Sequence, residues 1–149
     1  KKKKNKMSKN LRRFHLAFPI KDIAGTRHFY VKVLGCTEGR STSNWIDFDF
    51  YGNQISGHIC PEPRQIKETS KVDGIDVPLQ HFGAIVSMDE FDELTKRVKE
   101  ENIEFVIEPT RRYPDQKGEQ MTMFIKDNSG NGIEFKAFKH EDEIFSKQL

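Results

Sequence analysis

Two histidines and one glutamate are the residues of this chain whose types and placement best suit metal chemistry. His15 follows Phe14 at the start of a short apolar run, and His81 precedes Phe82 at the start of another. Glu134 lies within an apolar run near the end of the chain. Two imidazoles and one carboxylate can bind a metal while leaving other coordination positions free for reactants. The sequence therefore predicts that His15, His81 and Glu134 bind a divalent metal.

The two histidines occupy matching places in an internal repeat. Each half of the chain reads as one strand, one helix and three further strands, or βαβββ. The first half has its strand at 14–20, its helix at 23–34 and its last strand ending near 60, and the second has its strand at 81–88, its helix at 91–101 and further strands at 103–107, 121–125 and 133–138. This pattern predicts an α+β fold of two tandem βαβββ modules.

Local signals support these elements. Asp22 is expected to cap the first helix and Gly35 to end it, while Asp89 is expected to cap the second. Residues 45–50 alternate apolar and acidic side chains, as a half-buried strand does. Residues 110–114 are expected to form a loop beside a cleft.

The repeat allows one strand to be compared with another. Aligning the turn at 51–53 with the turn at 129–131 puts Ser56 opposite Glu134, and His58 opposite Lys136 on the same face. The first module thus lacks a carboxylate where the second has one. That place is expected to stay open for water or substrate, which is typical of a reactive rather than a structural metal site.

Length and composition suit one compact domain. The chain has 149 residues, of which 35% are hydrophobic and 11% aromatic, as in a globular protein with a substantial core. The domain is predicted at 11–140, with module one at 13–60, a proline-containing linker at 61–79 that has room for a helical turn, module two at 80–138 and a tail at 141–149. A lysine run precedes Met7, so residues 1–10 are expected to be a disordered arm or an addition from expression.

Charge and hydropathy exclude several classes. The net charge is +2, and without the lysine run the chain is slightly acidic, which argues against nucleic acid as a partner. No stretch approaches the roughly 18 apolar residues that span a bilayer, so we expect a cytoplasmic protein without a membrane partner. Cys36 and Cys60 form no CxxC pair and are expected to be small, buried, apolar side chains.

Five motifs carry a family resemblance. They are FHLAFP at 14–19, WIDFDF at 45–50, HFG at 81–83, GEQ at 118–120 and NGIEFKAF at 131–138. They resemble the vicinal oxygen chelate superfamily, which includes glyoxalases, extradiol dioxygenases, fosfomycin-modifying enzymes and bleomycin-binding proteins. They are most similar to a bacterial group of predicted extradiol-type dioxygenases. The resemblance covers 14–138 and implies a curved mixed β-sheet cleft built from the paired modules.

The resemblance also implies a ligand set and a reaction. His15, His81 and Glu134 fall on the positions that hold Fe(II) in the extradiol branch, although Mn(II), Ni(II) or Zn(II) would also suit them. The implied activity is ring cleavage of a small catecholic substrate with O₂, in a homodimer. His58 is the first candidate for the acid or base and Tyr113 a weaker one, and Arg111 or Arg112 is a candidate partner for a substrate carboxylate.

Other interpretations remain open. A histidine that lines the cleft without a chemical role is as good an explanation of His58, and solvated loop residues are the simpler explanation of Tyr113 and its neighbours. A glyoxalase-type metal-dependent isomerase or lyase is an alternative, against which Ser56 counts because it is a poor fourth ligand. A non-catalytic small-molecule binding protein is another, against which the three ligand-type residues count.

Overall fold

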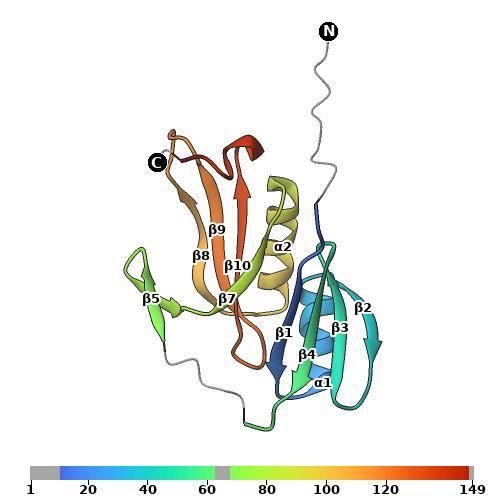
Figure 1. Ribbon diagram of the computed structural model, residues 1–149. Helices are drawn as coiled ribbons and strands as arrows, with labels where there is room; N and C mark the ends of the chain where they lie inside the picture. Colours follow the sequence, from blue (N-terminus) through green and yellow to red (C-terminus); the bar gives the residue numbers. More distant parts are fainter. Residues whose placement is uncertain (1–10, 63–67, 148–149) are drawn as a thin grey trace.

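Two four-stranded sheets of the same design make up most of the molecule. The computed structural model describes residues 11–62 and 68–147, and Figure 1 shows the two sheets with their helices. Module one consists of β1 (His15–Ile20), α1 (Ile23–Arg27), a π-helical segment (His28–Val33), β2 (Thr37–Ser41), β3 (Trp45–Phe50) and β4 (Asn53–Ile59). Its strands lie in the order β1-β4-β3-β2, with β1 and β4 parallel.

Module two repeats this plan. It consists of β7 (His81–Ile85), α2 (Met88–Glu100), β8 (Phe105–Arg112), β9 (Gln120–Lys126) and β10 (Gly132–Phe138), in the order β7-β10-β9-β8. The β7 and β10 strands are parallel and the other pairs are antiparallel. The predicted α+β fold of two tandem βαβββ modules is therefore confirmed. A short 3-10 turn (Glu141–Glu143) follows β10.

The helix ends follow the sequence signals in part. Asp22 caps α1 by accepting a hydrogen bond from the Gly25 N–H, and Gly35 ends the helical stretch with a positive φ of 76°. The cap of α2 is Ser87, which forms a reciprocal capping box with Glu90. The prediction that Asp89 caps this helix was wrong, because Asp89 already lies in its first turn.

The connection between the modules differs from its prediction. A small hairpin of β5 (Thr69–Val72) and β6 (Ile75–Pro78) occupies a stretch that was predicted as loop with room for a helical turn. Residues 63–67 of this connection, and the predicted arm at 1–10, lie outside the described residues. Strand β8 also extends through Arg112, so most of the expected loop at 110–114 is strand.

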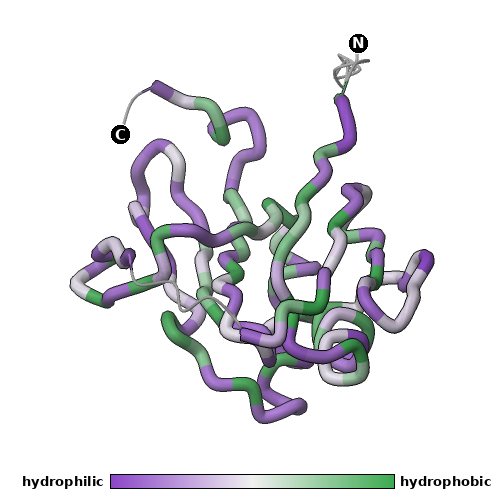
Figure 2. The backbone as a smooth tube through the Cα atoms, turned by 60° about the horizontal axis from the view of Figure 1, so that its bottom comes forward, coloured by the Kyte–Doolittle hydropathy of each residue, from purple (hydrophilic) through white to green (hydrophobic). Residues whose placement is uncertain are grey.

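Both sheets bury one face in a shared core. Sheet one contributes Phe18, Ile20, Ile46, Phe48 and Ile55, and sheet two contributes Met123, Ile125, Ile133, Phe135 and Ala137. In Figure 2 the hydrophilic stretches lie mainly in the peripheral loops. Because side chains alternate along a strand, the remaining residues of each sheet point to the face opposite the core. We call these surfaces the outer face of module one and the outer face of module two.

The two outer faces can be read directly from the strand registers. On module one the outer face carries His15, Ala17, Pro19, Trp45, Asp47, Asp49, Gln54, Ser56 and His58. On module two it carries His81, Gly83, Ile85, Gln120, Thr122, Phe124, Glu134, Lys136 and Phe138. The predicted common face of Gln54, Ser56 and His58 is therefore confirmed.

The turn between β9 and β10 joins the modules by polar contacts. The Tyr30 hydroxyl donates to Asp127 at 3.1 Å, and the Asn131 amide donates to the Pro19 carbonyl at 2.8 Å. Burial raises the pKa of both Tyr30 and Asp127. These contacts hold the start of β10, and therefore Glu134, in a defined place relative to module one.

No helix among residues 11–62 and 68–147 is long and apolar enough to cross a bilayer.

Candidate metal centre

The strand registers place Ser56 and Glu134 at equivalent positions. In module one, His15 pairs with Gln54, and Ser56 follows two residues later on β4. In module two, His81 pairs with Gly132, and Glu134 follows two residues later on β10. The sequence alignment that set Ser56 opposite Glu134 is therefore confirmed.

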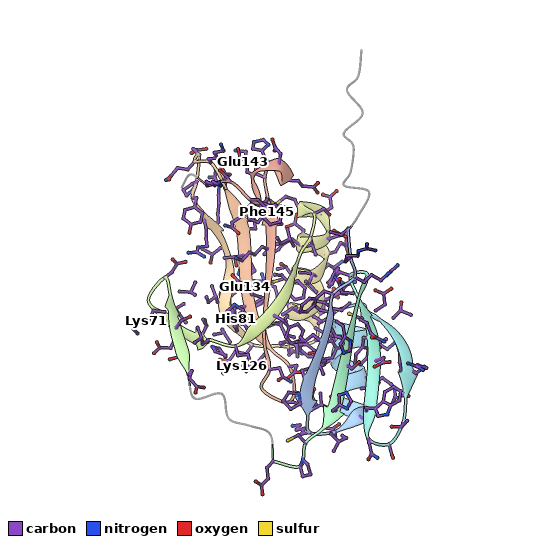
Figure 3. The ribbon with its side chains drawn as sticks, in the orientation of Figure 1. Lys71, His81, Lys126, Glu134, Glu143 and Phe145 are labelled. Atoms are coloured by element: carbon purple, nitrogen blue, oxygen red, sulfur yellow. The ribbon has the colours of Figure 1, made fainter. Side chains whose placement is uncertain are left out.

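His81 and Glu134 lie together on the outer face of module two. The His81 Nε2 atom is 3.3 Å from Glu134 Oε2, and the two side chains are 25% and 16% exposed. Figure 3 shows them projecting from neighbouring strands of the sheet. They are close enough to bind one ion together while remaining open to solvent.

The second nitrogen of His81 defines what the pair can bind. Nδ1 lies 2.7 Å from the Pro78 carbonyl, and because a carbonyl can only accept, Nδ1 carries the proton. A neutral imidazole then points the Nε2 lone pair at a carboxylate, so that two acceptors face each other. Either a proton on Nε2 or a cation shared by both groups resolves this conflict. The donor set therefore fits a divalent metal, with Pro78 orienting the imidazole as metal-binding histidines require.

Neighbouring side chains orient the carboxylate. The Thr122 hydroxyl donates to Glu134 Oε1 at 2.9 Å, which leaves Oε2 directed at His81. The Phe124 ring lies edge-on to the imidazole with centroids 5.0 Å apart. Phe124 is itself buried by Val77 of the β5–β6 hairpin. One side of the pair is thus apolar and shielded, and the other is polar.

A glycine is required beside this pair. A Cβ atom on Gly83 would collide with the backbone oxygen of Glu134, so β7 can approach β10 here only without a side chain. A Cβ atom on Gly132 would lie 2.9 Å from the Phe124 ring and 3.2 Å from the His81 Cβ. Gly83 therefore permits the close approach of the two strands, and Gly132 leaves room for the His81 and Phe124 side chains.

The structure brings together two of the three predicted ligands. His15 is exposed on the outer face of module one and has no close contact with the pair of module two. Within residues 11–62 and 68–147 of one chain, no three His, Cys, Asp or Glu side chains gather closely enough to hold a metal. A single chain thus supplies His81 and Glu134 from one face and His15 from another.

The predicted acid or base residues lie apart from the pair. His58 is exposed on the outer face of module one, four residues further along the strands than His15. Tyr113 follows the far end of β8, where Arg112 stacks over its ring at 5.2 Å. From the register, that end of the sheet is roughly 20 Å along the strands from His81.

The two arginines beside Tyr113 have different partners. Arg111 forms an ion pair with Glu119 at 2.7 Å, and Arg112 pairs with Asp73 of the β5–β6 hairpin at 3.3 Å. Both were candidates for binding a substrate carboxylate. The partner of Arg111, Glu119, also accepts a hydrogen bond from the Asp115 N–H, so Arg111 helps to hold the β8–β9 turn. Arg112 lies beside Gln120 at the end of the outer face.

Sequence reasoning missed three groups that shape the outer faces. Asp47 is buried and accepts a hydrogen bond from Ser56 at 2.5 Å, and Thr122 and the Pro78 carbonyl orient the pair. The alternation in residues 45–50 does place Asp47 on the face opposite the core, so the sequence pattern could have indicated this residue. No sequence pattern indicates the role of a backbone carbonyl such as that of Pro78.

Comparison with known proteins agrees with the fold. A family model for the Glyoxalase/Bleomycin resistance protein/Dioxygenase superfamily matches residues 12–135. A glyoxalase/bleomycin resistance protein/dioxygenase from Alicyclobacillus acidocaldarius is similar in structure, with TM-score 0.74 and 31% identity over 93% of this chain and 100% of that one.

More distant structures share the fold. The fosfomycin resistance protein FosX from Listeria monocytogenes has TM-score 0.65 and 21% identity over 92% of this chain and 98% of its own. A virulence protein from Salmonella typhimurium has TM-score 0.60 and 24% identity over 89% and 99%. The curated proteins contain no match. With the family model spanning both modules, the chain belongs to the glyoxalase/bleomycin resistance protein/dioxygenase superfamily.

Proposed function

We propose that the protein is a metal-dependent enzyme, a ring-cleaving dioxygenase of extradiol type that acts on a small catecholic substrate with O₂. The ligands of its metal are His81 and Glu134 of one copy and His15 of a second copy. The observation that supports this most is the His81–Glu134 pair, in which an oriented Nε2 lone pair faces a carboxylate across 3.3 Å. Two histidines and one glutamate suit Fe(II), and bound Fe(II) would supply the redox chemistry that O₂ requires.

A second copy is invoked because the two outer faces of one chain lie on opposite sides of a shared core. Both sheets direct their other face into that core. The outer face of module one offers His15 and His58 without a carboxylate at the place of Ser56, and the outer face of module two offers His81 and Glu134. Laying the first face of one copy over the second face of another joins all three ligands.

The remaining groups then have defined tasks. Pro78 and Thr122 hold the two ligands in orientation, and Phe124 with Val77 keeps water from one side of the pair. His58 is the candidate to accept the proton of a catechol hydroxyl, because an imidazole can serve as a general base and His58 shares its face with His15. Tyr113 is the weaker candidate for the same role.

The first test is metal content followed by oxygen uptake. We expect near-stoichiometric iron in anaerobically purified protein, its loss in His15→Ala, and catechol-dependent oxygen uptake by the iron-loaded protein. Nickel or zinc without oxygen uptake would instead indicate the isomerase, and a protein that retains no metal would be a binding protein.

A mixing experiment tests the shared site. His15→Ala and Glu134→Ala each lack one ligand, but a mixed pair of copies contains one complete set of ligands. If the site is shared, unfolding and refolding the two variants together restores metal binding to about a quarter of the sites, since half of random pairs are mixed and each has one intact site of two. Refolding each variant alone is the control. If no binding returns in the mixture, the ligands do not come from two copies.

A further inference from the structure

The outer face of module one holds a carboxylate that the proposed ligand set does not use. Asp47 lies on β3 and pairs with Ser56 of β4, which in turn pairs with Ala17 of β1. These three residues form the middle row of the face. The row that begins with His15 lies on one side of it and the row that contains His58 on the other, each roughly 7 Å away along the strands. Asp47 and Ser56 are therefore one row nearer to His15 than His58 is.

Ser56 occupies the place that Glu134 has in module two. Each lies two residues beyond the residue that pairs with the histidine of its module, and Glu134 reaches the imidazole of His81 from there. The serine side chain is shorter than that of glutamate, so it leaves a gap where the carboxylate group would lie. An oxygen atom of a substrate in that gap would be within reach of the Ser56 hydroxyl. Ser56 therefore adjoins the place beside His15 that is left open for substrate.

Asp47 is a buried carboxylate held mainly by hydrogen bonds. The residue is 7% exposed, and its Oδ1 atom accepts the Ser56 hydroxyl at 2.5 Å. Its Oδ2 atom lies 3.4 Å from the Gln54 amide nitrogen and 4.0 Å from Arg40, whose side chain is 84% exposed. The buried carboxylate of Glu119, by contrast, has two cations within 3.1 Å. Asp47 can therefore accept a proton that reaches it through the serine hydroxyl.

The surroundings of Asp47 leave it open toward the outer face. A Cβ atom on Gly39 would lie 3.3 Å from the Cβ atom of Asp47, so β2 lies close beside Asp47 on the side away from Ser56. Asp47 and Gln54 also line a hollow of about 290 Å³ that extends to Arg13. The face thus has room for a small molecule beside the hydrogen-bonded pair of Ser56 and Asp47.

We propose that Ser56 and Asp47 form a proton relay that accepts the proton of one catechol hydroxyl. This inference rests on the proposed function and deepens it. A catechol that binds a metal through both oxygens can lose the protons of both hydroxyls, and the imidazole of His58 accepts only one. In the relay, the proton of the second hydroxyl passes to Ser56 Oγ as the proton of Ser56 passes to Asp47 Oδ1. Only O–H bonds form and break, and the negative charge moves from the carboxylate to the catechol oxygen.

The test follows the ionisation of a bound catechol by its colour. The visible spectrum of 4-nitrocatechol changes with each proton that it loses, and Zn(II)-loaded protein can bind it without turning over O₂. At neutral pH we expect the spectrum of the dianion in wild type and that of the monoanion in Asp47→Asn and Ser56→Ala. Both variants are expected to bind the dye about tenfold more weakly, because a hydrogen bond to a charged group is lost. A merely structural role of Asp47 would not change the ionisation of the bound dye.

Asp49→Asn is the matched control. It removes the same charge from the same face and strand, where Asp49 accepts a hydrogen bond from the Gly52 N–H, and it is expected to keep the spectrum of the dianion. Zinc content and thermal unfolding are measured on each variant first. A monoanion in wild type, a dianion in folded, zinc-loaded Asp47→Asn, or an equal change in Asp49→Asn would overturn the relay while leaving the metal site standing. A wild type that binds no zinc, or no dye, would overturn both proposals.

Discussion

The outer faces of the two modules carry the same kinds of side chain on different strands. In module one a hydroxyl, Ser56, lies on the strand beside the histidine strand, and it donates to the carboxylate of Asp47 one strand further away. In module two the carboxylate, Glu134, lies on the strand beside the histidine strand, and Thr122 one strand further away donates to it. Because the carboxylate and the hydroxyl lie on opposite strands of the pair in the two modules, only module two places a carboxylate within reach of its histidine.

The histidine strands differ as well. Two residues after His15 stands Ala17, and two residues after His81 stands Gly83. Ala17 pairs with Ser56, and Gly83 pairs with Glu134. Only the glycine lets the neighbouring backbone come as close as it does in module two. The repeat thus supplies one scaffold, and two substitutions on adjacent strands make one copy of it suitable for a metal.

Removing the carboxylate from one face and the hydroxyl from the other should give the largest contrast. Glu134→Ala is expected to weaken metal binding by at least about 100-fold, because it deletes a ligand, while Ser56→Ala changes metal affinity little. His81→Ala should match Glu134→Ala. Metal content by elemental analysis and affinity by competition with a chelator measure this, and circular dichroism shows whether each variant is folded. Unchanged metal retention in His81→Ala and Glu134→Ala would exclude the proposed site.

The next contrast exchanges the small residues that follow the two histidines, Gly83 on β7 and Ala17 on β1. Gly83→Ala is expected to destabilise the fold by about 3 kcal/mol, since the new methyl group must push the Glu134 backbone away and β7 can yield only by losing pairing. Ala17→Gly should cost about 0.5–1 kcal/mol, the ordinary penalty for a glycine in a strand. Urea unfolding of both variants gives the two free energies. Equal costs would mean that the close approach in module two is not a constraint.

The third effect concerns the orientation of the carboxylate. Thr122→Val removes the hydroxyl that binds Glu134 Oε1 but keeps the shape of the side chain. We expect metal affinity to fall about tenfold, as is typical for loss of a group that orients a ligand. Thr122→Ser keeps the hydroxyl and is the matched control, with metal affinity close to that of wild type. If both variants bind metal equally well, the hydrogen bond does not orient Glu134.

Much of this architecture was predictable because it depends on local pattern. Alternation defined β3, and the repeat of turn residues correctly aligned Ser56 with Glu134, since a strand register follows from the turn that begins it. The capping signal at Asp22 was correct for the same reason. At α2 two acceptable caps stood close together, and the capping box of Ser87 with Glu90 satisfied more backbone groups than Asp89 could.

What the sequence could not show depends on contacts between distant segments. The β5–β6 hairpin lacks a strong strand pattern, and it folds where Val77 packs on Ile107 and Phe124 and where Asp73 meets Arg112. The proximity of His81 to Glu134 was predictable from the repeat. That His15 faces away from them was not, because the way two modules of one chain pack together leaves no trace in either repeat.

The smallest expected effect is the loss of stability as pH falls and an ion pair in each module is protonated. The Arg111 guanidinium, with the Asp115 N–H and Lys139, holds the pKa of Glu119 at about 2. Arg27 likewise lowers the pKa of Glu38 in module one. A carboxyl whose pKa is lower in the folded chain than the roughly 4.3 of an unfolded one stabilises the fold above that value. For Glu119 this contribution is lost as pH falls toward about 2.

Glu119→Gln should therefore be less stable than wild type near neutral pH, and the difference should shrink toward zero as pH approaches about 2. Glu38→Gln should change in the same direction by less, because its side chain is 29% exposed and that of Glu119 only 9%. Urea unfolding of both variants between about pH 2 and pH 7 measures the two curves. A difference that stays constant with pH would show that the shape of the Glu119 side chain, and not its charge, holds the β8–β9 turn. That turn leads directly into Gln120, so the same curve reports how firmly the far end of the outer face of module two is held.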